Sequence, residues 1–475
     1  MEDGKAVQPE NPVVIVEEKE AKTNAAAWIE RHIPFNRMIW VFFVMNMLNY
    51  TERVVVSGSS MKMLEFIRKS VSSHENTYLG ALTSIFIGGF SIASIVFGYL
   101  VTKHPPFRVV SWALICWLLA ALCSGLAPNY WVLLFARLVS GVGEAAFQIV
   151  VPAYVNDCAP LERVGSSMAI LYSAISVGTA VGFMGSGYVS QHYSWRYMYL
   201  GVAPLMLPLI LITYFIPYEK KNKEESQLSV IRSSLGLFKD PVFIFSFLAE
   251  ASGVFICAAY MAFGNQLLIH LGLFQDESTS SLVFGAISVI AGLIGSILGG
   301  ATLNWMKIDA SFSVAKKLLY YAYHFGACAL CCLLAFVITA FTVRSRVVFL
   351  GAFFFAFTFV FASNPTWSLV ILHTATPLLR PMALGVATIC YHILGDVPAP
   401  IVVGRVLDFF LKRAGKDKVR VWYAYLYTHW FTLCQCCCMV LWCGLIVLFT
   451  KRRFSHEKES LIVEENAEFA QCRVC

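Results

Sequence analysis

Apolar residues fall along this chain in long blocks, each bounded by a short polar or charged stretch. A helix needs about 20 residues to cross the hydrocarbon core of a bilayer, and twelve blocks approach or exceed that length. The first six lie at 37–58, 78–101, 109–127, 130–152, 166–190 and 195–217, and the other six at 241–270, 280–303, 317–342, 346–372, 382–410 and 424–450. The pattern predicts an all-α membrane protein with twelve transmembrane helices and no sizeable soluble domain.

A charged break at 218–240 divides the predicted helices into two sets of six. We therefore expect five parts: a cytosolic N-terminal tail at 1–36, a six-helix half at 37–217, a cytosolic linker at 218–240, a second six-helix half at 241–450 and a cytosolic C-terminal tail at 451–475. Internal doubling of this kind is typical of secondary transporters, whose substrate site lies between the halves near the bilayer midplane.

Composition agrees with a chain that folds in lipid, because 58% of its residues are apolar, 14% are charged and the mean hydropathy is +0.67. These values exclude an ordinary soluble domain. We expect no cleaved signal peptide, and the first span would then direct insertion.

The net charge of +7 is spread over loops and tails, so we expect membrane-flanking charge and no nucleic-acid partner. Basic residues flank both ends of the helical region, which favours cytosolic tails. One loop argues against that assignment. At 412–420, on the opposite side, the chain carries Lys412, Arg413, Lys416, Lys418 and Arg420.

No motif for catalysis, metal binding or nucleotide binding occurs along the chain. Thirteen of the fifteen cysteines lie in or beside predicted spans, where cysteine serves as a small apolar residue. We therefore expect no enzyme activity, no metal and no cofactor.

Ionisable side chains inside predicted spans are the main functional signal, since each costs about 2.5 to 3.5 kcal/mol on insertion scales. They are Glu52 and Arg53 in the first span, Arg137 and Glu144 in the fourth, Glu250 in the seventh, and His392 and Asp396 in the eleventh. Such residues usually face the interior of the bundle. The alternative is a set of polar clamps that hold helices together.

Spacing and depth indicate which of these groups can meet. Glu52 and Arg137 both lie about 10 Å below the outer face by helical rise, so a contact between them is plausible. Arg137 and Glu144 are seven residues apart on one helical face, and His392 and Asp396 are four apart on another. Both pairs can point at one central cavity.

Several stretches resemble a known family. Arg137-Leu-Val-Ser-Gly-Val-Gly-Glu-Ala145 is similar to the fourth-span signature of major facilitator transporters, and Ser194-Trp-Arg-Tyr-Met198 to the entry of their sixth span. Asn49-Tyr-Thr-Glu-Arg53 resembles the Asn-Tyr-x-Asp-Arg of Spinster-type lipid transporters. The more specific motif, His392-Ile-Leu-Gly-Asp-Val-Pro-Ala-Pro400 followed by Gly404 and Asp408, resembles their eleventh span.

The resemblance implies a major facilitator fold that exports lysophospholipids or sphingosine 1-phosphate by alternating access, often coupled to protons. Glu52 and Glu144 match the family's first-span and fourth-span acids, and Arg53 and Arg137 match its basic residues. We assign Glu52 and Glu144 to proton coupling. To substrate binding we assign Arg53, Arg137, His392, Asp396 and Glu250. A monomer surrounded by membrane lipid is expected.

The chain departs from the major facilitator pattern in the loop after the second span. A cytosolic latch of the form Gly-x-x-x-Asp-Arg-x-x-Arg is replaced by Gly98 leading to Thr102-Lys103-His104-Pro105-Pro106. The corresponding position after the eighth span is Asn304, where an acid is common. A weaker inward gate and a different substrate are both compatible with this change.

Two other readings stay open. The solute could instead be a sugar, an organic anion or a drug, because a fold does not determine a substrate. A non-transporting membrane sensor is the remaining class. In the C-terminal tail, Glu457, Leu461 and Ile462 fit an acidic dileucine sorting signal and predict an endosomal or lysosomal membrane over the plasma membrane.

Overall fold

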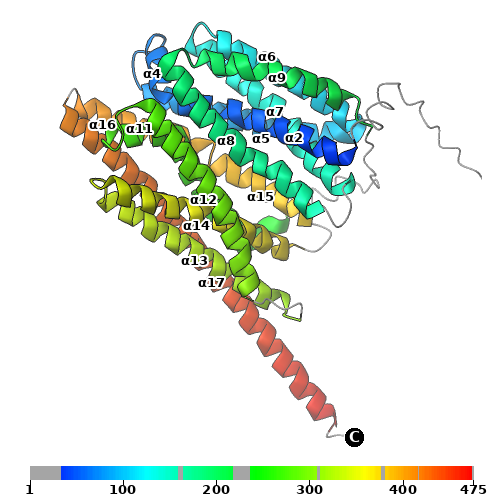
Figure 1. Ribbon diagram of the computed structural model, residues 1–475. Helices are drawn as coiled ribbons and strands as arrows, with labels where there is room; N and C mark the ends of the chain where they lie inside the picture. The colour runs from blue at the N-terminus through cyan, green and yellow to red at the C-terminus, as the bar shows by residue number, and fades with distance from the viewer. Residues whose placement is uncertain are drawn as a thin grey trace, which may run out of the picture.

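The computed structural model describes residues 34–158, 164–217, 236–306, 311–375, 380–415 and 417–472. This part of the chain is built almost entirely of long α-helices (Figure 1). Within it, eleven helical spans are long and apolar enough to cross a membrane. The predicted all-α membrane class is confirmed.

The first half begins with three helical segments in succession, α2 (Phe35–Arg53), α3 (Val55–Gly58) and α4 (Ser60–Arg68). Five long helices follow: α5 (Glu75–Lys103), α6 (Pro106–Leu126), α7 (Tyr130–Cys158), α8 (Val164–His192) and α9 (Arg196–Tyr214). The closest packing within this half pairs α7 with α5 and α6, α8 with α2, and α9 with α6.

The first span, predicted at 37–58 as one continuous helix, is longer than predicted and is interrupted twice. The helix starts at Phe35 and runs on to Arg68, with breaks at Val54 and Ser59. The segment α2 is not among the eleven apolar spans because polar side chains, among them Asn46, Asn49 and Glu52, lower its mean hydropathy. Together α2, α3 and α4 make the twelfth element of the expected twelve.

The second half contains η2 (Gly236–Lys239), α11 (Pro241–His270), α12 (Glu277–Trp305), α13 (Val314–Phe341), α14 (Arg346–Thr374), α15 (Arg380–Leu394), α16 (Pro398–Ala414) and α17 (Lys418–Cys472). The predicted eleventh span is split into α15 and α16 around Gly395, Asp396 and Val397. Pro398 and Pro400 lack backbone N–H groups, and this explains why one continuous helix does not form there.

The predicted C-terminal tail at 451–475 is helical through Cys472, because α17 continues past the membrane-spanning region. It projects beyond the other helices (Figure 1). Two contacts connect it to the second half. Arg453 pairs with Asp240, which caps α11, and the Ser313 hydroxyl donates a 2.7 Å hydrogen bond to Glu457.

The two halves pack against each other through α5 with α16 and through α8 with α12. Their hydrogen bonds lie at one end of the bundle, which holds the turn between α16 and α17 and is called the far end below. There Asp408 accepts four bonds of 2.6–3.2 Å from Asn76 and Thr77, and Glu277 accepts one of 2.8 Å from the Met61 amide.

Glycines permit the close approach of α5 and α16. A Cβ added at Gly80 would lie 2.1 Å from the Pro400 carbonyl oxygen, and one at Gly404 would lie 2.4 Å from that of Asn76. Farther along α5, a Cβ at Gly88 or Gly98 would meet nothing within 4 Å. The described residues therefore pack the halves tightly at the far end and more loosely beyond it.

Candidate functional site

A polar stripe runs along one face of α7. Arg137, Ser140, Glu144 and Gln148 recur at spacings of three or four residues, which places them on the same side of the helix. This side faces the first half's own interior, and Arg137 and Glu144 are fully buried there. The stripe meets α2, whose buried polar residues supply its partners.

The expected contact between Glu52 and Arg137 is present. Nη1 of Arg137 lies 2.5 Å from Oε1 of Glu52, and both side chains are 0% exposed. Nη2 of the same guanidinium donates to the Arg53 carbonyl oxygen at 3.1 Å, and the Ser140 hydroxyl donates to Glu52 at 3.2 Å. Arg137 therefore joins α7 to the last turn of α2.

Glu144 makes a different set of contacts. Its Oε1 accepts a 3.1 Å hydrogen bond from Gln148, whose amide nitrogen also donates to Asn46 at 2.8 Å. Among the described residues, Oε2 of Glu144, Oε2 of Glu52 and Nε of Arg137 have no hydrogen-bond partner. The cluster thus retains polar atoms that a ligand, a proton or water can engage after a small movement.

Arg53 is the less committed of the two arginines. Its guanidinium lies over the rings of Tyr50 and Phe86, at 5.3 and 5.2 Å from their centroids. The Arg137 guanidinium also lies over the Phe86 ring, 4.5 Å from its centroid. The described side chains offer Arg53 no carboxylate at ion-pair distance, so its N–H donors are available to an anion.

His392 and Asp396 form the corresponding cluster in the second half. Nδ1 of His392 lies 2.9 Å from both carboxylate oxygens of Asp396, at the break between α15 and α16. The imidazole also packs against the ring of Phe90 on α5, with centroids 6.3 Å apart. Because Phe86 and Phe90 are one turn apart on α5, this helix connects the polar clusters of the two halves.

Glu250 stands apart from both clusters. It is 6% exposed on α11, and no described residue gives it a hydrogen bond or an ion pair. Beside it, the backbone of Ala251 lies against Gly395 at the α15–α16 break. The structure therefore places Glu250 next to the second cluster without joining it to that cluster.

Sequence reasoning missed Ser140, Gln148, Asn46, Tyr50 and Phe86. The first two were detectable, because they continue the spacing of Arg137 and Glu144 on α7. The others depend on which helices become neighbours.

The described residues contain no group of three metal-binding side chains. Leu461 and Ile462 lie in the projecting part of α17, and their side chains, with those of Thr102 and Asn304, are outside the described residues.

Fold and site together define a class: a polytopic membrane protein of two helical halves with buried charges between its helices, the architecture of a secondary transporter. Residues 36–400 match the family described as the Major Facilitator Superfamily. The chain belongs to that superfamily.

The resemblance to Spinster proteins is confirmed by curated relatives. The chain is 27% identical to a probable sphingolipid transporter, spinster homolog 2 of Arabidopsis thaliana, over 86% of this chain and 88% of that protein. It is 24% identical to the sphingosine-1-phosphate transporter SPNS2 of Xenopus tropicalis, over 88% and 82%. Since these relatives are transporters, this chain is a transporter of the spinster type and not an enzyme.

Solved structures show the same fold. A bacterial homologue of the human lysosomal transporter Spinster, in an inward-facing and unoccupied conformation, aligns with a TM-score of 0.70 at 15% identity, covering 91% of this chain and 98% of that one. A D-xylose–proton symporter aligns at 0.63 and 14% identity, covering 83% and 96%.

Proposed function

We propose that this chain moves a single-chain lipid with an anionic head group, a lysophospholipid or a sphingoid phosphate, by alternating access coupled to protons. The observation that carries the proposal is the Arg53 guanidinium, which contacts two aromatic rings beside the buried Arg137–Glu52 pair. A phosphate requires fixed cationic donors in a site with little water. Relatives named for sphingolipid and sphingosine-1-phosphate transport support this substrate class.

The described conformation supports alternating access. Hydrogen bonds and glycine contacts close the halves at the far end, so the other end, which holds the projecting part of α17, would be the open one. If both tails are cytosolic, this is an inward-facing state. An outward-facing state would require the bonds of Asp408 and Glu277 across the halves to break.

Proton coupling is assigned to Glu52, with Glu144 as the second candidate. Protonation of Glu52 would remove the charge that pairs with Arg137, and the Arg137 guanidinium would then be free beside the last turn of α2. Binding of a proton and binding of a head group would be linked, because each changes what the arginines bind. On the other side, His392, Asp396 and Glu250 would contact the substrate from the second half.

Transport assays in proteoliposomes test the proposal. Purified protein is reconstituted with a pH gradient, and efflux of a lysophospholipid, a sphingoid phosphate and a hexose is compared. We expect Arg53→Lys to raise the KM for the lipid about tenfold, because lysine loses the fork that holds two phosphate oxygens. Transport of the hexose alone would reject the lipid assignment.

Arg137→Lys separates binding from structure in the same assay. Arg137 bonds Glu52 and the Arg53 carbonyl, so its loss should lower both transport and thermal stability. Arg53→Lys should lower affinity and leave stability unchanged. Equal loss of stability in the two variants would mean that Arg53 is also a structural clamp.

A further inference from the structure

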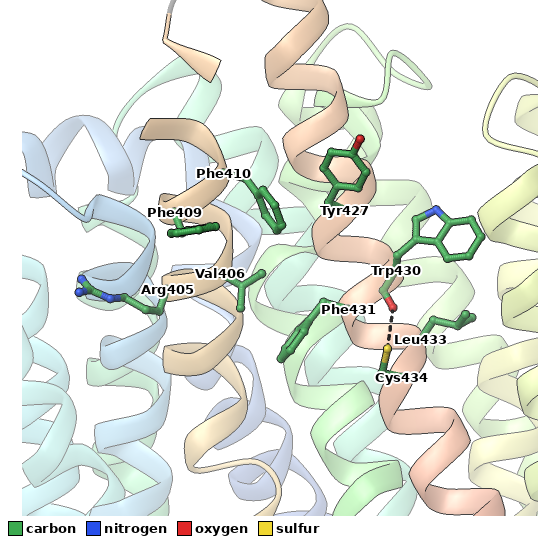
Figure 2. A pocket seen from close by; sticks show the side chains of 9 residues that line it. All are labelled: Arg405, Val406, Phe409, Phe410, Tyr427, Trp430, Phe431, Leu433 and Cys434. Atoms are coloured by element: carbon green, nitrogen blue, oxygen red, sulfur yellow. Dashed lines mark hydrogen bonds between the residues drawn. The ribbon is translucent and has the colours of Figure 1, made fainter. Parts of the chain in front are cut away.

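A groove runs between α16 and α17 at the far end, away from the buried clusters. It has a volume of about 610 Å³, within the range of sites that hold small-molecule ligands, roughly 300–1,000 Å³. Figure 2 shows Val406 and Phe410 of α16 and Phe431 of α17 projecting into the gap between the two helices. Both helices belong to membrane-spanning segments, so a ligand would enter from the bilayer.

Aromatic side chains make most of the groove wall. Phe410 and Tyr427 face each other with ring centroids 5.2 Å apart, and Phe409 and Tyr427 are 50% and 49% exposed. Single aromatic residues are common where a membrane protein meets the lipid head groups. Here they line a continuous hollow, which suits an acyl chain.

A second hollow of about 340 Å³ continues the groove toward the end of the bundle. It shares Phe410 and Tyr427 with the groove and adds Arg413 and Arg420. Gly415 adopts a φ of +60° at the turn between α16 and α17, and this turn brings the two arginines to one mouth. The Arg405 side chain, by contrast, points away from the gap (Figure 2).

The mouth has an excess of positive charge. The Arg413 guanidinium lies 3.9 Å from the centre of the Phe409 ring, and no described carboxylate pairs with it. Arg420 pairs with Asp417 at 3.5 Å, but both side chains are exposed, so this pair is weak and readily exchanged. Two arginines therefore face one carboxylate.

The basic residues of this loop run against the predicted topology. The 412–420 loop carries five basic residues on the side that the predicted topology places outside the cytosol. The positive-inside rule does not account for them. A bound anion would account for the two arginines, Arg413 and Arg420, that line the second hollow.

We propose that this groove binds one anionic phospholipid of the adjoining leaflet, with its phosphate at Arg413 and Arg420 and one acyl chain between α16 and α17. Guanidinium groups match phosphate oxygens in geometry and charge. The apolar groove lies directly below the charged mouth, as a lipid requires. This site is separate from the Arg53 cluster on α2, so it does not depend on the transported substrate.

Native mass spectrometry of the detergent-purified protein tests the proposal. Phosphatidylglycerol and phosphatidylcholine with identical chains are added, and one-to-one adducts are quantified. We expect the wild type to prefer phosphatidylglycerol, and the preference to fall about fivefold for each of Arg413→Gln and Arg420→Gln. Val406→Trp, which fills the groove, should reduce adducts of both lipids.

A charge-matched control makes the result decisive. Lys412→Gln removes the same charge from an adjacent exposed residue that lines neither hollow, and it should keep the wild-type preference. The proposal is overturned if the Arg413→Gln, Arg420→Gln double variant binds phosphatidylglycerol like the wild type, or if Lys412→Gln loses as much. Thermal unfolding of each variant identifies any that fail to fold, and Arg413→Lys then replaces them, with an intermediate preference expected.

Discussion

At the residue scale, Glu52 is the carboxylate that joins proton binding to helix movement in the proposed mechanism. It accepts bonds from Arg137 and Ser140 and is completely buried in this conformation. We expect Glu52→Gln to bind substrate but to lose most of the dependence of transport on pH between about 5 and 7.5, because the amide cannot take up or release a proton. The measurement is transport rate in proteoliposomes across that range.

The second acid provides the comparison for this experiment. Glu144→Gln should keep more of the pH dependence, because Glu144 bonds Gln148 and no arginine. A wild-type pH profile in Glu52→Gln would move the assignment to Glu144 or His392.

Glu250 yields a prediction about stability. A buried carboxyl without a described partner carries a desolvation cost that a neutral amide largely avoids, so Glu250→Gln should raise the free energy of unfolding by about 1 kcal/mol or more. Glu52→Gln should lower it by about 3 kcal/mol, since it leaves the Arg137 charge buried and uncompensated.

Thermal unfolding of both variants in the same lipid and at the same pH measures the contrast. If Glu250→Gln loses as much stability as Glu52→Gln, Glu250 has a stabilising partner and the stability argument fails. A further outcome concerns the substrate. If adding substrate raises the unfolding temperature of the wild type and of Glu52→Gln but not of Glu250→Gln, then Glu250 contacts the substrate.

At the element scale, the crossing of α5 and α16 controls the closed far end. Gly80→Ala would place a Cβ against the Pro400 carbonyl, and overpacking of this kind costs about 1–3 kcal/mol. We expect the variant to favour the state open at the far end and to transport more slowly. Hydrogen–deuterium exchange of peptides that contain residues 75–80 and 398–408 should rise.

Gly88→Ala is the matched control, because it lies on the same helix and an added Cβ meets nothing within 4 Å. It should leave exchange and transport near the wild-type values. Asp408→Asn should act in the same direction as Gly80→Ala by weakening four bonds to α5. Unchanged exchange in both Gly80→Ala and Asp408→Asn would contradict this account of the gate.

At the scale of the whole molecule, the projecting end of α17 bears on where the transporter resides. We propose an endosomal or lysosomal membrane, directed by Glu457, Leu461 and Ile462. Replacing Leu461 and Ile462 with alanine should move a fluorescently tagged protein to the cell surface, as measured by surface labelling. The Glu457 carboxylate already accepts a bond from Ser313, so the acidic position is held against α13.

Ser313→Ala is the control for that contact, since it frees Glu457 without altering the dileucine pair. It should leave the protein in its intracellular membrane or strengthen its retention there. Identical distribution of the wild type and the dileucine variant would remove the signal from the account of localisation.

The sequence by itself determined the class of this protein and the identity of its central charges. Length and hydropathy of the apolar blocks suffice for a membrane-spanning helical bundle, because a bilayer accepts little else. The cost of burying charge made Glu52, Arg137, His392 and Asp396 stand out, and their spacing indicated the contacts that the structure contains.

Only the tertiary structure decided how those charges divide their roles. Arg137 is paired and Arg53 is available because of the way α2, α5 and α7 pack together. The sequence of a single helix does not specify which helices become its neighbours. The breaks at Val54 and Gly395 and the long α17 also escaped prediction, because packing and local backbone chemistry set helix ends. The groove beside Arg413 exists because the turn at Gly415 brings Arg413 and Arg420 together. From the sequence, these residues could be placed only in a basic loop.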